Sequence, residues 1–201
     1  MISNPKLDPP TLEGMHVLLL PIAMEDAAEL SKVTDLETFQ YFVSPTPSEQ
    51  SEAGFQSLVQ YLIETPSIQG FVIRDKKSQG VIGSTSFLDI RSEDDHVEIG
   101  MTWYGQQWRG TLVNPECKLL LLTYAFDNLN CERVTLKCDD RNEHSKSAIL
   151  KIGAKLEGTL RKHRRTSTGY MRDTTYFSIL QDEWPEVRSQ LKERLAKIAQ
   201  V

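Results

Sequence analysis

The sequence lacks several features that would place it in specialised classes. No apolar run approaches the roughly 18 residues of a membrane span, and the first residues have no signal-peptide core. The three cysteines, Cys117, Cys131 and Cys138, are odd in number and show no CxxC spacing. Neither a disulfide framework nor a zinc site is supported. We therefore expect a cytoplasmic protein that has no metal and no membrane contact.

Two phosphate-binding motifs and a basic charge balance are also missing. The chain has neither GxxxxGK[ST] nor GxGxxG, so an enzyme that uses nucleoside triphosphates is disfavoured. The net charge is −5, from 23 Lys and Arg against 28 Asp and Glu. This balance disfavours DNA as a partner and mildly favours a cationic one, although acidity also serves solubility.

The composition is that of an ordinary globular chain. It has 201 residues, of which 39% are apolar and 25% charged, and this length buries a core without disulfides or a structural metal. We expect residues 1–10 to be an irregular, proline-bearing lead-in. Residues 11–201 are expected to form one domain that includes a C-terminal helix.

Apolar periodicity predicts alternating blocks of strands and helices. Strands are expected at residues 15–22, 70–75, 80–90, 96–104, 131–138, 154–161 and 170–180, and helices at 24–33, 48–64, 114–129, 141–154 and 182–199. This order predicts an α/β (α+β) fold, in which a mixed central sheet of about six to seven strands has helices on both faces. In strand 96–104, simple alternation would put Val97, Ile99, Met101 and Trp103 on one face and His96, Glu98, Gly100 and Thr102 on the other.

The segment GQQWRGTLVNPE, residues 105–116, passes from a polar loop directly into an apolar-striped helix. The first turn of a helix has unpaired backbone N–H groups and the positive end of the helix dipole, which together bind phosphate. Gly110 permits a tight bend. Asn114 is the expected N-cap, with Pro115 at the first helical position. An unliganded loop before a well-capped helix fits these residues equally well.

Four segments together resemble the GNAT superfamily of N-acetyltransferases, and within it the ribosomal-protein (RimJ/RimL-like) branch. They are residues 12–30, the strand pair 81–90 and 96–104, residues 107–126, and residues 134–161. The third resembles the family's pyrophosphate loop, Gln/Arg-x-x-Gly-x-Gly/Ala. Gln107 and Gly110 match that pattern, whereas Leu112 departs from it.

The resemblance implies an enzyme that moves acetyl from acetyl-CoA directly to an amine, with no covalent enzyme intermediate. The amine belongs to a protein N-terminus or to a small molecule. The residues expected to contact the coenzyme are Thr102, Trp103, Gln107, Trp108, Arg109, Gly110, Thr111, Leu112, Val113, Asn114, Asn142 and Ser145. The resemblance also places an opening between two sheet strands near residues 102–104.

Three residues are candidates for the chemistry. Glu98 is the expected base, and its alternative role is an ion-paired sheet carboxylate. Ser145 is expected near the coenzyme sulfur, although it and Asn142 also fit simple helix capping. Tyr176 is the candidate proton donor to the departing thiolate, with packing as its alternative. Cys117, whose position in the first turn favours a lowered pKa, is expected to be structural because direct transfer needs no thiol.

Other functions remain open at this level. Leu112 gives weight to a catalytically weak CoA-binding sensor or scaffold, and an interaction domain with an empty cleft is a third hypothesis. The basic segment 161–165 fits a solvated hairpin tip, a contact to the CoA adenosine, or an RNA contact. Segments 34–50 and 161–170 are expected to line the acceptor cleft. A homodimer is also open.

Overall fold

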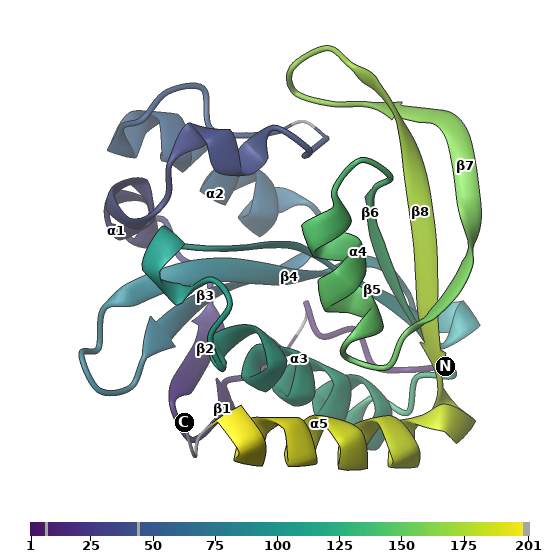
Figure 1. The fold of residues 1–201 in the computed structure, drawn as a ribbon. Helices are drawn as coiled ribbons and strands as arrows, with labels where there is room; N and C mark the ends of the chain where they lie inside the picture. The colour runs from purple at the N-terminus through teal and green to yellow at the C-terminus, as the bar shows by residue number, and fades with distance from the viewer. Residues whose placement is uncertain (7, 44, 199–201) are drawn as a thin grey trace.

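The computed structural model describes residues 1–6, 8–43 and 45–198. Its centre is one eight-stranded sheet in the order β1-β2-β3-β4-β5-β6-β8-β7, with helices on both faces (Figure 1). All neighbouring strands are antiparallel except β5 and β6, which are parallel. The predicted mixed sheet in a single domain is confirmed.

The elements follow the predicted order closely. The strands are β1 (Leu12–Glu13), β2 (Val17–Pro21), β3 (Gln69–Asp75), β4 (Val81–Arg91), β5 (His96–Tyr104), β6 (Arg133–Asp139), β7 (Lys155–Arg165) and β8 (Met171–Leu180). The helices are α1 (Asp26–Val33), α2 (Glu52–Glu64), α3 (Val113–Thr123), α4 (Glu143–Leu150) and α5 (Trp184–Ile198), with short turns η1 (Leu36–Phe39) and η3 (Gln106–Trp108). None of the helices in the described part of the chain has both the length and the apolar character needed to cross a membrane.

The sheet has one strand more than the highest predicted count, and the extra strand is β1. It pairs with β2 through Leu12 and Glu13 alone, too short a stretch for a period of two to be recognised. The turn between β1 and β2 depends on Gly14, because a Cβ there would lie 2.3 Å from Glu116 Oε1. The same carboxylate accepts from the His16 amide at 2.9 Å, so helix α3 fixes the edge of the sheet.

Two apolar clusters hold the layers together. The larger joins the sheet to α3, α4 and α5 and includes Phe87, Leu121 and Trp184. The smaller joins the opposite face to α1 and α2 and includes Leu30 and Phe55. Residues 1–6 and 8–11 form neither strand nor helix, yet Ile2 is buried in the larger cluster.

Strand β5 does not alternate as predicted, because it contains a bulge. Ser84 pairs with Trp103 and Ser86 pairs with Gly100, so three steps on β5 match two on β4. Met101 has φ 44° at the extra residue. The bulge moves Met101 and Trp103 into the α1/α2 cluster, whereas Val97 and Ile99 face α3. The prediction that all four share one face is therefore wrong.

Candidate functional site

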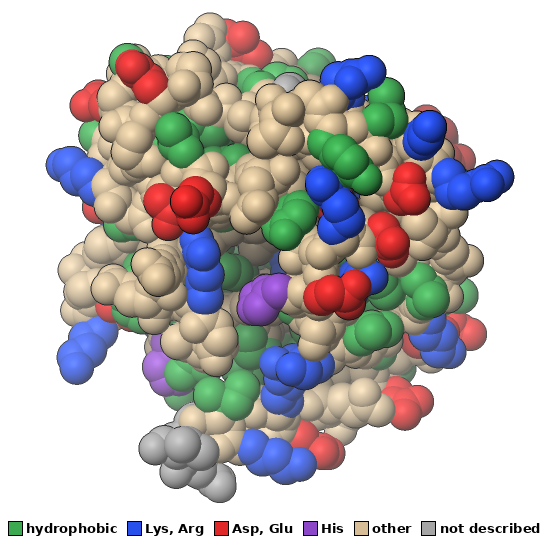
Figure 2. All heavy atoms as spheres, turned by 45° about the horizontal axis from the view of Figure 1, so that its top comes forward, with side chains coloured by type: hydrophobic (Ala, Val, Ile, Leu, Met, Phe, Trp, Pro, Cys, Tyr) green, Lys and Arg blue, Asp and Glu red, His purple; other side chains and the backbone are tan. Residues whose placement is uncertain are grey.

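The sheet opens where its two parallel strands diverge. Strands β5 and β6 pair only through His96, Val97 and Glu98, opposite residues 133–135. From Ile99 to Tyr104, β5 has no pairing on its β6 side within the described chain. We call this stretch, residues 99–104, the open segment of β5. The open segment begins earlier than the opening expected near residues 102–104. In the space-filling view, the molecular surface has a hollow near its centre (Figure 2).

The loop after β5 presents unpaired backbone donors. The amides of Gly110, Thr111, Leu112 and Asn114 donate to no acceptor among the residues described. Gly110 has φ 74°, which favours glycine. These amides lie where α3 begins, so their partial charges add to the positive end of the helix dipole.

The cap predicted for α3 is wrong. The helix begins at Val113, and Leu112 occupies the N-cap position without a side-chain hydrogen bond. Asn114 lies inside the first turn, where its Oδ1 accepts from the Tyr104 hydroxyl at 3.2 Å. Thr111 Oγ1 instead accepts from the Val113 amide at 3.3 Å and donates to the Trp108 carbonyl at 2.7 Å.

The side chains around this loop point in several directions. Arg109 donates to the Tyr104 carbonyl at 3.1 Å and to Thr38 Oγ1 at 2.7 Å, so its guanidinium ties the loop to η1. Gln107 is exposed, and Trp108 is half-buried against the larger cluster. The side chains predicted around the coenzyme are therefore not all directed to one place.

Trp103 and Val113 are core residues. Trp103 is buried and packs edge-to-face on Phe39 with 5.2 Å between ring centroids. Val113 is buried in the larger cluster. Only the backbone of these two residues is available to a ligand.

Glu98 lies at the last paired position of β5, beside the opening. Its Oε2 is 2.6 Å from Lys137 Nζ on β6. Burial raises the pKa of Glu98 above its ordinary value, and the Lys137 charge opposes that rise. A carboxyl with a raised pKa is a better proton acceptor than an exposed one, and the ion pair of the alternative interpretation is also present.

Tyr176 belongs to the same face as Glu98. It pairs with Lys137 across β6 and β8, and Lys137 Nζ lies 4.7 Å from the centre of its ring. The His163 ring centroid is 5.8 Å from that of Tyr176. Phe177, the next residue on β8, faces the opposite cluster.

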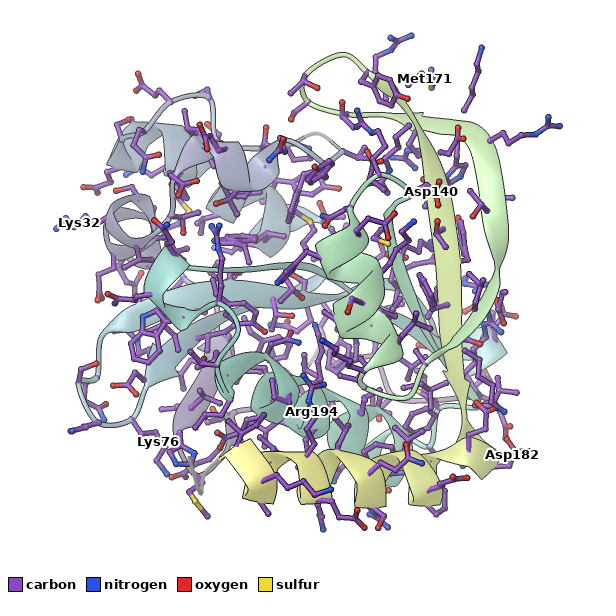
Figure 3. All side chains as sticks on the ribbon, viewed as in Figure 1. Lys32, Lys76, Asp140, Met171, Asp182 and Arg194 are labelled. Carbon is purple, nitrogen blue, oxygen red and sulfur yellow. The ribbon has the colours of Figure 1, made fainter. Side chains whose placement is uncertain are left out.

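The N-terminus of α4 holds the other predicted residues. Asn142 Oδ1 accepts from the Ser145 amide at 3.0 Å, so Asn142 caps the helix. Burial raises the pKa of the Cys138 thiol to about 11, and the nearby Ser145 hydroxyl opposes that rise. Asp140, labelled in Figure 3, accepts from Thr175 Oγ1 at 2.8 Å and fixes this turn to β8. Ser145 and Tyr176 therefore lie on opposite faces of the sheet.

Lys118, a buried charged residue beside the open segment, was not among the predicted site residues. Lys118 on α3 is 5% exposed, and its Nζ donates to Thr102 Oγ1 on the open segment at 2.8 Å. Burial lowers the pKa of Lys118 to about 8. A lysine between Cys117 and Leu119 in an apolar helix is the signal that sequence reasoning could have used.

Cys117 lies in an environment that disfavours the thiolate form. Burial raises the pKa of its thiol to about 12, opposite to the lowering that a first-turn position favours. Desolvation outweighs the helix dipole here, and the expected structural role agrees with this environment.

Two segments far apart in the sequence meet at the tip of the β7–β8 hairpin. The tip of the β7–β8 hairpin forms a bridge between Val43 and Thr166, and the Ser167 amide donates to the Phe42 carbonyl at 2.9 Å. We call residues 39–43 and 166–170 the acceptor wall. The Arg141 guanidinium lies 3.6 Å from the centre of the Tyr170 ring in this wall. The hairpin tip is thus docked, although most of its basic side chains are exposed.

The comparisons with known proteins agree with this geometry. Residues 16–155 match the acetyltransferase (GNAT) domain family. The uncharacterised N-acetyltransferase p20 of Bacillus licheniformis is 28% identical over 179 residues, covering 87% of this chain and 98% of p20.

Solved structures extend the likeness. One is the crystal structure of a provisionally assigned acetyltransferase from T. thermophilus. It is 35% identical, has a TM-score of 0.86, and the match covers 93% of this chain and 97% of that one. Mycobacterium smegmatis RimJ, solved in complex with CoA-disulfide, shares the fold at 19% identity and a TM-score of 0.78, covering 92% and 95%. The family uses acetyl-CoA. The chain therefore belongs to the GNAT acetyltransferase family and is an acyltransferase.

Proposed function

We propose that this protein is an acetyl-CoA-dependent N-acetyltransferase that moves acetyl directly to a primary amine. The observation that supports the proposal most strongly is the junction of the open segment of β5 with the four unpaired amides at residues 110–114. The amides at residues 110–114 suit a diphosphate, and the open segment of β5 suits the oxygen of a thioester.

The residues present fit the coenzyme. The amides of Gly110, Thr111, Leu112 and Asn114 would hold the diphosphate. The Leu112 amide donates to no acceptor in the described chain, so its N–H can donate to a ligand although Leu112 departs from the family pattern. Unpaired amides of the open segment would bind the thioester oxygen, where negative charge develops. Acetyl-CoA supplies the activated acetyl group.

Glu98 is the proposed general base. The attacking amine must be neutral, and a carboxylate of raised pKa on the acceptor side can take its proton. The new C–N bond forms as the C–S bond breaks, and the electron pair of that bond leaves on sulfur. The Lys137 ammonium group, with Nζ 2.6 Å from Glu98 Oε2, orients the carboxylate through an ion pair. Ser145 lies on the opposite face, where its hydroxyl is a candidate partner for the sulfur.

A peptide N-terminus is the acceptor that we favour. The acceptor wall combines the Tyr41 and Tyr170 rings with the guanidinium of Arg141, a surface suited to an extended chain with aromatic and carbonyl groups. The shared fold with RimJ agrees with this class. Small amines remain the alternative that the experiment decides.

The test combines coenzyme binding with turnover. Thermal stability is measured with CoA and acetyl-CoA, and thiol release is followed with N-terminal peptides, polyamines and aminoglycosides. We expect stabilisation by both coenzymes and turnover of peptides. Stabilisation without turnover of any amine would indicate the sensor or scaffold instead, and no stabilisation would contradict both functions.

Two glycines supply a matched pair of variants. Gly110 and Gly169 have φ 74° and 87°, and an added Cβ meets nothing within 4 Å at either. Gly110→Ala and Gly169→Ala therefore introduce similar backbone strain. Only Gly110→Ala should weaken CoA binding.

A further inference from the structure

Lys118 is a buried amine without a counter-charge. No carboxylate lies within 4 Å of its Nζ in residues 1–6, 8–43 and 45–198. The only hydrogen-bond partner of Nζ in that part of the chain is the Thr102 hydroxyl. Buried charges in proteins are normally paired, because an unpaired one loses its hydration without compensation.

The position of Lys118 connects it to the open segment rather than to the loop. It lies five residues beyond Val113, about 7 Å further along the helix axis at 1.5 Å per residue. Thr102 Oγ1, which receives its hydrogen bond, also bonds Thr85 Oγ1 at 2.8 Å. This chain of polar groups lies beside the β5 bulge, where the strand leaves its pairing with β6.

Among the residues that the structure describes, no carboxylate competes for the Lys118 ammonium group. Its neighbours that titrate are Cys117 and, next to that thiol, Tyr104, and burial keeps both neutral by raising their pKa values. The Glu116 carboxylate is paired with His16, with Oε2 3.0 Å from Nδ1. On the β6 side of the opening, burial keeps the Cys138 thiol neutral by raising its pKa to about 11.

We propose that the Lys118 ammonium group stabilises the negative charge that collects on the coenzyme sulfur during acetyl transfer. This inference rests on the proposed function, since it requires acetyl-CoA in the opening. The C–S bond breaks with its electron pair on sulfur, and the ammonium group offsets that charge until the thiolate takes a proton. Lys118 has no anionic partner among the described residues, and the departing thiolate would supply one during the reaction.

The pH behaviour of Lys118 suits this role. Its lowered pKa of about 8 keeps the amine largely protonated at neutral pH while making its charge responsive to a nearby anion. A thiolate beside it should raise the pKa of Lys118, and Lys118 should in turn lower the pKa of the bound thiol.

The test measures ionisation of bound CoA and therefore needs no acceptor amine. The ultraviolet absorbance of the thiolate is titrated in the wild type, Lys118→Met, Lys118→Arg and Lys32→Met. Lys32 lies on α1, away from the opening (Figure 3). We expect the bound thiol to ionise about one pH unit higher in Lys118→Met, a roughly tenfold loss of thiolate stabilisation. Lys118→Arg should retain much of the effect, and Lys32→Met should match the wild type.

Turnover supplies a second readout where an acceptor is known. Lys118→Met should lower kcat about tenfold or more while leaving the KM for acetyl-CoA within about twofold. Equal thiol ionisation in the wild type and Lys118→Met would overturn the role of Lys118 alone. Failure of the wild type to bind CoA would overturn both this inference and the proposed function.

Discussion

At Glu98, burial and an ion pair act in opposite directions on one carboxyl group. Burial raises its pKa, and Lys137 at 2.6 Å opposes the change. The balance leaves a carboxylate that accepts a proton more readily than an exposed one. The sequence pattern indicated this residue because of its place on β5, whereas Lys137 comes from a strand some forty positions later and could not be paired with it from spacing.

The first prediction concerns Glu98→Gln. Removing the base should lower kcat/KM by about 100-fold or more. In the wild type, the rate should rise as pH increases through the raised pKa of Glu98, because the ionised form is active. That rise should disappear in the variant. The pH profile of kcat/KM checks this, and an unchanged profile would exclude Glu98 as the base.

The second prediction concerns the stability cost of Lys118. Its pKa falls from 10.5 unfolded to about 8 folded, a difference worth about 3 to 4 kcal/mol at about 1.4 kcal/mol per pKa unit. Between these values the unfolded chain binds more protons, so the free energy of unfolding rises with pH in that window and is lowest below pH 8.

Lys118→Met should therefore unfold at higher urea concentration than the wild type at pH 7. The difference should shrink as pH approaches 10. Urea titrations of both proteins at pH 7 and pH 9.5 measure it, and a variant less stable at both pH values would show that the Thr102 hydrogen bond outweighs the cost of burial.

At the scale of single elements, strand β5 and helix α4 decide the site. The β5 bulge turns Met101 and Trp103 to the face opposite Val97 and Ile99. Alternation alone does not reveal it, although Gly100 inside the strand is a residue that often marks a bulge. At α4, Asn142 satisfies the Ser145 amide. A coenzyme contact from the amide nitrogen of Asn142 stays a prediction.

The third prediction separates these two roles of Asn142. Asn142→Ser keeps a good N-cap acceptor but removes the side-chain N–H donor. Stability should stay within about 0.5 kcal/mol of the wild type, while CoA affinity should fall. Asn142→Ala should lose about 1 kcal/mol of stability as well. Calorimetric CoA titrations and thermal unfolding check both, and unchanged affinity in Asn142→Ser would leave capping as the whole role.

At the scale of the molecule, the acceptor wall joins segments more than 120 residues apart. Arg172 on β8 donates to the Tyr41 carbonyl at 2.8 Å, and Ser167 Oγ donates to the Phe39 carbonyl at 3.3 Å. The proposed coenzyme site lies on β5, α3 and α4 instead. Binding of acceptor and coenzyme should therefore be separable. The homodimer stays a prediction.

The fourth prediction tests that separation. Replacing residues 166–170 by a two-residue Asn-Gly turn removes the docked hairpin tip. The KM for the acceptor should rise about tenfold, equivalent to about 1.4 kcal/mol, while the dissociation constant of CoA should change by less than about twofold. Steady-state kinetics and CoA calorimetry measure the two quantities, and a matching loss of CoA affinity would contradict this division.

The sequence by itself determined the order of elements, the mixed sheet with helices on both faces, and the loop at Gly110, because periodicity and turn residues act over a few neighbouring positions. Tertiary structure alone decided the β5 bulge, the residue at which β5 leaves β6, the true start of α3 and the burial of Lys118. Each of these depends on which distant atom occupies the adjacent space, such as Tyr104 beside Asn114 or Thr102 above Lys118. Local patterns carry no information about such contacts. The candidate loop and strand could therefore be named from the sequence, whereas the charges and hydrogen bonds around them could not.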